Sequence, residues 1–416
     1  MLGLGLALTN FGSKGGIADV ADGGSLAARL LAKETQGLAI DFTDLSMQIK
    51  DTGTPANSFA GDPNTKLTYT SPSTKWILNK TGVYVSGTTL RTEYDANGVA
   101  LGIRVEEART ELCLQNSDFT NASWTKSNMT TAKTATGADG TANSASTLTA
   151  TAGNATALQA ITSGSAARIT GCFIKRRTGS GNIDITQDNG ATWTTVTVTA
   201  SWSQVGIASV TSANPTVGIR IVTSGDAVDV MWFTHQLGTF LTSPIVTAGS
   251  TVTRAADAIN FSAFTWNGNA STLYTKGRLL DAAAFIGSGT MIAQVSLTAI
   301  SGFAGVMIFT DSTKRYGLRV RQDGGSSTIF ATSAVNSGLS PGAFDKLAVA
   351  HITGDSAGYQ NAAQAGTSAT AHATTTLQTM GIGGSPAGGF HSNGYIAQIM
   401  YLPRRMTNAE LVTVTT

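Results

Sequence analysis

Apolar and polar residues alternate along several short stretches in the middle of the chain. In each stretch a polar residue stands between two apolar ones: Ile183 and Ile185 flank Asp184, Val196 and Val198 flank Thr197, Ile219 and Ile221 flank Arg220, and Val228, Val230 and Trp232 alternate with Asp229 and Met231. A period of two places one set of side chains on the buried face of a strand and the other toward solvent. Asn189-Gly190 is a favoured hairpin turn. The pattern predicts an antiparallel β-sandwich or jelly roll over residues 113–257.

Shorter strand-like runs lie on both sides of this region. From Ile40 to Ile103 they are separated by Gly, Pro and Asn, which predicts a small β domain over residues 40–112. Strand patterns return in residues 258–416, where a final strand precedes a short helix capped at Thr407 or Asn408. The predicted fold class is therefore all-β, with tandem β-sandwich (jelly-roll) modules behind a short N-terminal anchoring segment.

Charged residues are concentrated between the first two of these regions, in residues 102–124. Glu106, Glu107, Arg109 and Glu111 stand there between apolar stretches. We interpret the segment as a hinge between modules and expect Arg109 to pair with a neighbouring carboxylate at their contact.

The first residues of the chain are apolar but do not resemble a membrane segment. Met1–Leu8 has no preceding Lys or Arg and is interrupted by Gly3 and Gly5. Neither a signal peptide nor membrane insertion is predicted. We assign residues 1–39 as an attachment segment that docks into a partner or its own oligomer, and a frayed terminus is an equally weighted alternative. The proposed attachment residues are Met1, Leu2, Leu4, Leu6, Leu8 and Phe11.

The composition favours strands and turns over helices. Only 12% of the 416 residues are charged, and 47 are glycine. The formal net charge of +2 gives no basic footprint for nucleic acid. The basic run Lys175–Arg177 is read as a solvated strand end. Two cysteines, Cys113 and Cys172, cannot form a disulfide framework, and two free, buried thiols are favoured over a single bridge.

The residues needed for hydrolytic or metal chemistry are sparse. No Glu occurs between Glu111 and Glu410, and the adjacent Glu106 and Glu107 would point to opposite faces of a strand. The histidines, His235, His351, His372 and His391, lack metal-ligand spacing. We therefore expect no enzyme, no catalytic residues, no metal and no cofactor.

Tryptophans offer the best candidates for ligand binding, because a flat ring can stack on the apolar face of a sugar. Trp193, Trp202 and Trp266 are the candidates for carbohydrate binding, and the alternative for each is a core anchor. For Trp232, in phase with Val228 and Val230, the core is the favoured interpretation.

Several phrases resemble one protein family. Four segments are similar in order and wording to phage head-spike and tail-fibre proteins. They are EEARTELCLQNSDFTNASW, GNIDITQDNGATWTTVTVTASWSQV, the segment from NPTVGIRIV to LTSPI, and VTRAAD. The resemblance implies a carbohydrate-binding-like jelly roll over residues 113–257. The closing segment from Gly394 resembles concanavalin-A-like (laminin-G-like) sandwiches, which implies that fold for residues 258–416. Gly238 follows Gln236-Leu237 where the family has an acidic residue, so no ligand role is carried over there.

The resemblance implies a virion structural protein: a head spike or fibre subunit of a tailed phage or phage-like particle. Its sandwiches would project to glycans of the host surface, and its partners would be capsid or tail proteins and host-surface polysaccharide. It would be a homo-oligomer, trimer or pentamer, assembled in the host cytoplasm and exposed on the virion. The alternatives are a tail-fibre polysaccharide depolymerase and a ligand-free capsid decoration protein.

Overall fold

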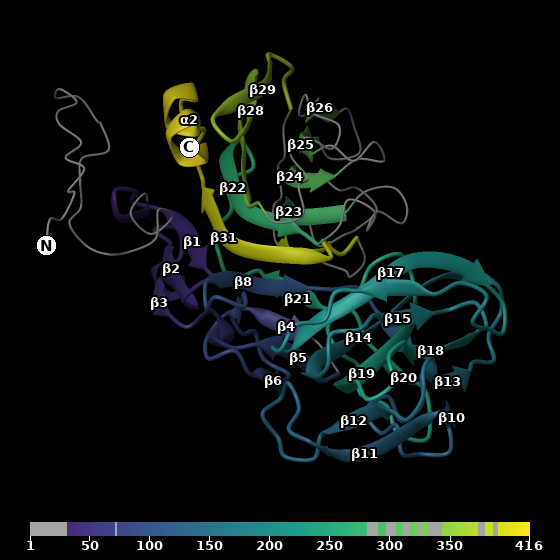
Figure 1. The fold of residues 1–416 in the computed structure, drawn as a ribbon. Coiled ribbons are helices and arrows are strands. Elements are labelled where there is room, and N and C mark those ends of the chain that lie inside the picture. Colours follow the sequence, from purple (N-terminus) through teal and green to yellow (C-terminus); the bar gives the residue numbers. More distant parts are fainter. Residues whose placement is uncertain are drawn as a thin grey trace, which may run out of the picture.

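The computed structural model describes residues 31–70, 73–280, 290–296, 305–310, 316–322, 327–331, 343–372, 379–385 and 390–416. These residues form two lobes that are built from strands (Figure 1), as the all-β prediction required. The chain ends in helix α2 (Asn408–Thr415), whose first turn is closed by a capping box in which Thr407 and Glu410 bond each other's backbone N–H. The proposed attachment residues Met1 to Phe11 lie outside the described part of the chain.

The lower lobe in Figure 1 is a sandwich of two antiparallel sheets. The first runs in the order β10 (Thr125–Ser127), β13 (Ala155–Ala160), β18 (Thr216–Ile221), β15 (Ile183–Thr186) and β16 (Thr194–Val196). The second runs in the order β11 (Met129–Ala135), β12 (Ala145–Ala150), β19 (Ala227–Leu237), β14 (Ala166–Thr178) and β17 (Ser203–Ser212), and is extended by β9 (Arg109–Glu111) and β20 (Val252–Arg254). We call this lobe the jelly roll.

The sequence pattern correctly predicted which side chains fill the jelly roll. Ile183, Ile185, Ile219 and Ile221 are fully buried in one core cluster between the two sheets. Both thiols belong to the same cluster and are not bonded to each other. Asn189 and Gly190 have φ values of 65° and 76° in the connection from β15 to β16, as their turn propensity indicated.

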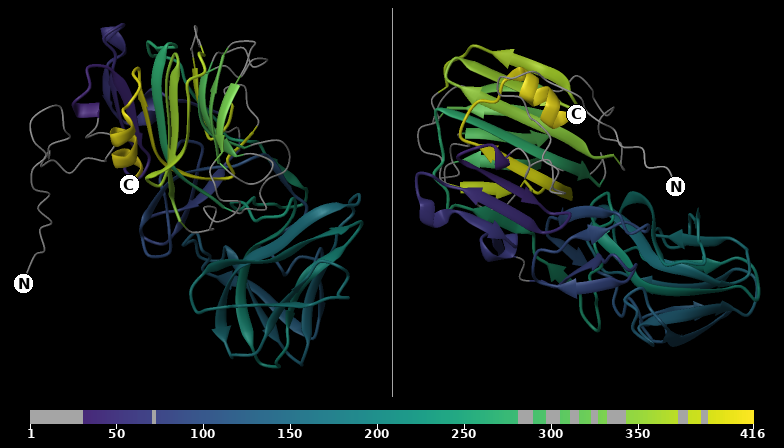
Figure 2. Two further views of the ribbon diagram at one scale, coloured as in Figure 1. Left: turned by 90° about the horizontal axis from the view of Figure 1, so that it is seen from above. Right: turned by 90° about the vertical axis from the view of Figure 1, so that its left-hand side faces the viewer.

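The upper lobe is a second, larger sandwich (Figure 2). Its larger sheet runs in the order β29 (Ala363–Ser368), β28 (Asp355–Gln360), β27 (Asp345–Ile352), β22 (Ala270–Leu279), β31 (Gly394–Leu402), β1 (Gly37–Asp41), β2 (Ser46–Lys50) and β3 (Phe59–Gly61), with β8 (Ala100–Val105) and β7 (Glu93–Tyr94) added beside β31. The smaller sheet runs in the order β26 (Ser327–Ala331), β25 (Tyr316–Arg321), β24 (Gly305–Thr310), β23 (Thr290–Ser296), β30 (Thr379–Ile382), β21 (Ala258–Phe261) and β4 (Thr68–Thr70).

The strands of residues 37–105 do not form the separate small domain predicted for residues 40–112. Strand β1 lies between β2 and β31, with Ile40 opposite Ile399, and β8 also pairs with β31. The start and the end of the chain therefore build one sandwich, and the jelly roll is inserted between them. Leu38 and Ala39, assigned by sequence to the attachment segment, are buried in this sheet. Local patterns show that a strand exists but not which distant strand it pairs with, which is why the boundary was misplaced.

One hairpin of the upper lobe reaches onto the jelly roll. It consists of β5 (Lys75–Leu78) and β6 (Tyr84–Gly87). The Tyr84 N–H donates to the carbonyl of Ala138 over 2.9 Å, and the rings of Trp76 and Trp232 lie 4.9 Å apart. We call this aromatic contact, which also includes Phe173, the clasp. The clasp gives the two lobes an apolar contact in addition to the chain segments that connect them.

Trp232 reaches the clasp because of a β-bulge. Opposite β14, Gly171 pairs with Thr234 and Phe173 pairs with Met231, so two residues of β19 face one residue of β14. Trp232 has φ 46°, and Phe233 takes the inward position in the jelly-roll core. Trp232 is 3% exposed, so its predicted burial is confirmed. The ring packs against the hairpin, however, and does not share the inward face of Val230 as the alternation predicted.

Candidate functional site

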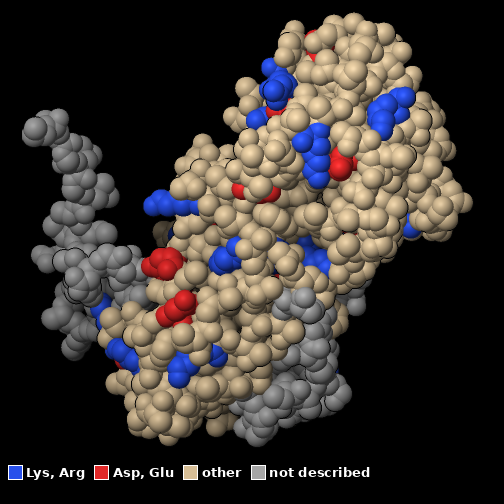
Figure 3. All heavy atoms as spheres, turned by 90° about the horizontal axis from the view of Figure 1, so that it is seen from below, with Lys and Arg blue, Asp and Glu red and all other residues tan. Residues whose placement is uncertain are grey.

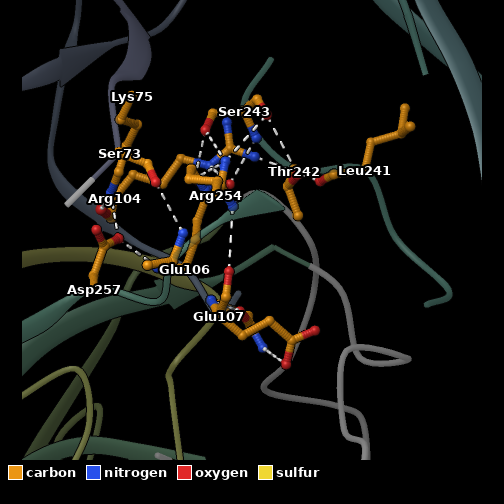
Figure 4. Close-up of polar contacts among 12 residues, drawn as sticks. Ser73, Lys75, Arg104, Glu106, Glu107, Leu241, Thr242, Ser243, Arg254 and Asp257 are labelled. Carbon is orange, nitrogen blue, oxygen red and sulfur yellow. Dashed lines mark hydrogen bonds and ion pairs between the residues drawn. The ribbon is translucent and has the colours of Figure 1, made fainter. Parts of the chain in front are cut away.

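The charged segment at the module boundary builds a buried ion cluster where the chain enters and leaves the jelly roll (Figure 4). The Glu106 carboxylate, fully buried, lies 2.9 Å from Arg104 Nε and 3.1 Å from the Arg254 guanidinium. It also accepts hydrogen bonds from the Ser243 N–H at 2.7 Å and the Ser243 hydroxyl at 2.6 Å. Burial by itself raises the pKa of Glu106, but the two guanidinium groups outweigh it and hold that pKa well below its usual range.

The same cluster includes a second buried pair beside the first. Asp257 pairs with Lys75, accepts from the Tyr69 hydroxyl at 2.8 Å, and accepts the Glu106 N–H at 2.8 Å. Glu93 lies 3.6 Å from Arg104. With all groups ionised, the three cations Lys75, Arg104 and Arg254 balance the three carboxylates Glu93, Glu106 and Asp257. Each carboxylate of the cluster has a cation beside it, so we assign the cluster to holding the lobes in one orientation.

Arg109 is paired as the sequence predicted. Its Nη2 lies 2.6 Å from the Glu107 carboxylate, and the guanidinium lies 4.5 Å from the centre of the Phe240 ring. Glu107 also accepts from the Asn393 side chain at 3.2 Å, which comes from the loop before β31 in the upper lobe. The adjacent residues Glu106 and Glu107 thus have different partners.

Glu111 is a buried carboxylate of the same segment that has no ion-pair partner among the described residues. It accepts hydrogen bonds from the Cys113 N–H, the His235 N–H and the Gln236 side chain, at 3.0, 2.8 and 3.0 Å. Burial raises the pKa of Glu111, and the hydrogen bonds oppose that rise. These bonds tie β9, on which the chain enters the jelly roll, to β19, and β9 also pairs with the exiting strand β20.

Trp193 is the sequence-predicted candidate that the structure places in a surface setting with polar groups around it. The ring is half-buried, and the Arg220 guanidinium lies 4.5 Å from its centre. Arg220 is held by two hydrogen bonds to one oxygen of Asp184, at 3.0 and 2.7 Å, and the other oxygen accepts from the Thr195 hydroxyl at 2.7 Å. We call Trp193, Arg220, Asp184 and Thr195 the Trp193 cluster.

The cluster lies on the outer face of the five-stranded sheet. Asp184 faces Arg220 across β15 and β18, and Thr195 faces Asp184 across β16. Sequence reasoning did not assign Asp184 and Arg220 to a site. The available signal was that each is a single charge between two isoleucines, which places both on the solvent face, but their register could not be known.

The other two candidate tryptophans lie elsewhere. Trp202 is half-buried beside the clasp, with the Lys175 ammonium 5.1 Å from its ring centre. Trp266 packs against the core of the upper lobe, 4.9 Å from the Tyr401 ring and 5.0 Å from the Phe264 ring. The three tryptophans therefore do not converge on one surface, and Trp202 and Trp266 both pack against hydrophobic clusters.

The remaining charged candidates have structural partners. Lys175 and Arg177 both pair with Asp229, and Arg176 pairs with Asp226. His235 is buried against Thr170, and burial lowers its pKa to about 4, so it is neutral at pH 7. Within the described ranges, no group of three or more His, Cys, Asp or Glu side chains is placed to hold a metal ion. Over the same ranges there is no helix of the length and apolarity that a membrane span requires.

Comparison with known proteins gives distant structural matches. No protein-family model matches the chain, and no curated protein matches its sequence. A solved structure of the NanB sialidase from Streptococcus pneumoniae is 15% identical with a TM-score of 0.30, and the match covers 36% of this chain and 25% of that one. The CBM40 module of the Ruminococcus gnavus IT-sialidase is 11% identical, covering 36% and 84% of the two chains, with a TM-score of 0.30. A heptameric SAP-like pentraxin from Limulus polyphemus is 14% identical, covering 36% and 70%, with a TM-score of 0.27. At these scores the matches carry no argument about function.

Proposed function

We propose that the chain is a non-enzymatic virion structural protein, a head spike or fibre subunit of a tailed phage or phage-like particle, that adheres to host-surface glycans. The particle assignment is supported by the resemblance of the boundary and jelly-roll phrases to phage spike and fibre proteins. The adhesive role is supported by the Trp193 cluster. Capsid or tail proteins would hold its N-terminal segment, and a symmetric attachment site would make it a homo-oligomer, trimer or pentamer.

The Trp193 cluster has the chemistry that sugar binding needs. A half-buried indole offers a flat apolar face, and the guanidinium and hydroxyl beside it can bond sugar hydroxyls. Because Asp184 fixes Arg220 through two hydrogen bonds, little side-chain freedom is lost when a ligand binds. One such site would bind weakly, and many copies on a particle would strengthen attachment.

The surface around the lobes is compatible with adhesion through neutral contacts. Figure 3 shows charged side chains as separate spots on a largely uncharged face. The two alternatives make different predictions: a tail-fibre polysaccharide depolymerase would release reducing sugar, and a ligand-free decoration protein would bind no glycan at any valency. The Trp193 cluster favours binding, and its one carboxylate is engaged by Arg220 and Thr195.

Replacing Trp193 by alanine is expected to weaken glycan binding about tenfold or more, because a stacked aromatic ring commonly dominates such an interface. The measurement is binding of the multivalent full chain to a glycan array and to whole host cells. Trp202→Ala is the matched control, since Trp202 lies beside the clasp, and it should bind as the wild type does. The assignment of the site would be contradicted if both variants lost glycan affinity equally. It would also be contradicted if the wild type bound no glycan.

Deletion of residues 1–30 is expected to prevent incorporation into particles and to leave both lobes folded. The deletion must stop before β1, because removing residues 1–39 would also take Gly37, Leu38 and Ala39 out of the central part of a sheet. Incorporation is measured on purified particles and folding by circular dichroism of the isolated protein. Normal incorporation of the shorter chain would refute the attachment role of the N-terminal segment.

A further inference from the structure

The outer face of the larger sheet in the upper lobe is divided into two parts. Helix α2 lies across one part (Figure 2, right), where Leu411 and Val414 pack with Tyr274, Ala348 and Met400. The neighbouring part of the same face carries charged and polar side chains from β22, β27 and β31. Packing of the helix therefore explains why one part of this face is apolar. It does not explain the charged and polar side chains of the other part.

Two lysines stand directly opposite each other in the polar part. Lys276 of β22 and Lys346 of β27 are cross-strand partners, and both are half-buried. Like charges in this position destabilise a sheet. Burial and the charge of Lys276 lower the pKa of Lys346. Within the described residues neither lysine has a carboxylate in ion-pair range, in contrast to the cations at the module boundary.

An aromatic ring and a third cation extend this pair. The Phe344 ring centre lies 5.4 Å from the Lys276 ammonium and 5.6 Å from the Arg278 guanidinium. Arg278 also lies 5.0 Å from the ring centre of Tyr395, its neighbour on β31. Lys276 and Arg278 thus lie two residues apart on β22 beside the half-buried Phe344 ring, and Lys346 faces Lys276 from β27.

Amide groups continue the row on both sides. Gln398 of β31 is the other cross-strand partner of Lys276, and Asn361 bonds the backbone of Lys346. The carboxylate of Asp41 on β1 is one strand further on, where it accepts from the Gln398 side chain at 2.8 Å and from the Thr43 N–H at 2.9 Å. Asp41 is therefore occupied by neutral donors, and Gln398 separates it from Lys276.

We propose that this row, Lys346, Lys276 and Arg278 with Phe344, is a second binding site, which takes the anionic groups of an acidic polysaccharide. Carboxylate, sulfate or phosphate on the sugar would supply the charge that the lysine pair lacks, and Phe344 would contact the apolar face of the ring. A nucleic acid is the less suitable ligand, since the chain has a net charge of only +2 and the row holds three cations.

The proposal extends the adhesive role by naming the chemical class of one glycan, but binding at this face does not depend on the Trp193 cluster. The test uses the full chain and three soluble polymers: polygalacturonate, dextran sulfate and neutral dextran. The wild type should bind the two acidic polymers and not dextran, with affinity that falls as salt concentration rises. The double variant Lys276→Gln/Lys346→Gln should lose at least about tenfold in affinity for the acidic polymers.

The controls separate this site from general electrostatics and from the first site. The variant Lys66→Gln/Lys80→Gln also removes two positive charges, but outside the row, and it should bind the acidic polymers as the wild type does. The Lys276→Gln/Lys346→Gln variant should keep its binding to the array glycans that Trp193→Ala loses, so failure of one site is visible without failure of the other. Because the Lys276→Gln/Lys346→Gln variant relieves a like-charge contact, it should be at least as stable as the wild type.

Three results would overturn the proposal: no binding of either acidic polymer by the wild type, an equal loss in the Lys66→Gln/Lys80→Gln control, or a marked loss of stability in the Lys276→Gln/Lys346→Gln variant. Tighter binding to duplex DNA than to both acidic polymers, lost in the same variant, would assign the face to nucleic acid instead.

Discussion

Replacing Glu106 by alanine is expected to destabilise the protein by about 3–5 kcal/mol, because it leaves Arg104 and Arg254 buried without their shared carboxylate. The side chains of both arginines are less than a tenth exposed, so water cannot replace the lost partner. The measurement is the free energy of unfolding in urea. Asp355→Ala, which removes a carboxylate paired with Arg405 at the surface, is the control and should cost less than about 1 kcal/mol.

The contribution of Glu106 should also depend on pH in a defined direction. The ion pairs hold the pKa of Glu106 in the folded protein well below its unfolded value of about 4.3. Its stabilisation is therefore fully present above the unfolded pKa and is lost as the pH falls toward the folded one. The difference in unfolding free energy between the wild type and Glu106→Gln should be constant near neutral pH and shrink below about pH 4. A difference that grows on acidification would contradict the assigned ion pairs.

Replacing Trp232 by alanine is expected to cost about 3–5 kcal/mol, since it removes the central ring of the clasp. The Trp232 ring lies 4.9 Å from Trp76, 5.8 Å from Tyr84 and 5.2 Å from Phe173, so three neighbours lose contacts at once. The β5–β6 hairpin should also lose protection against hydrogen exchange, because its contact with the jelly roll would be weakened.

The matched control for Trp232 is Trp193→Ala, a tryptophan in the same lobe that is half-buried at the surface. Its cost should stay near or below about 1 kcal/mol, with unchanged protection of the hairpin. Equal destabilisation by the two variants would mean that the clasp contributes no more to stability than a tryptophan at the surface. Loss of stability without loss of hairpin protection would place the role of Trp232 inside the jelly roll alone.

The inserted arrangement gives the two lobes different requirements for folding. All strands of the jelly roll come from one continuous stretch, whereas the upper lobe needs β1 and β8 to pair with β31 near the end of the chain. Gln398 donates a hydrogen bond to Asp41, which precedes it by 357 positions. The buried ion cluster and the clasp then hold the lobes relative to each other.

Part of the candidate site could be read from the sequence. Alternation placed Asp184 and Arg220 opposite the buried isoleucines of their strands, and the aromatic ring of Trp193 beside a strand made it a possible binding residue. The meeting of these residues depends on the register of β15, β16 and β18, which adjacent residues do not specify. The pairing of Arg109 was predicted, but its partner Glu107 was identified by the structure.

The sequence by itself determined the all-β class, the inward positions of Ile183 and Ile219, the turn at Asn189-Gly190 and a helix cap at Thr407 or Asn408, because each depends on residues a few positions apart. The tertiary structure alone decided that residues 37–105 complete the C-terminal sandwich, that a bulge turns Trp232 onto the hairpin, and that Lys276 faces Lys346. These features depend on pairings between strands far apart in the chain, and such pairings are selected by the packing of the whole core.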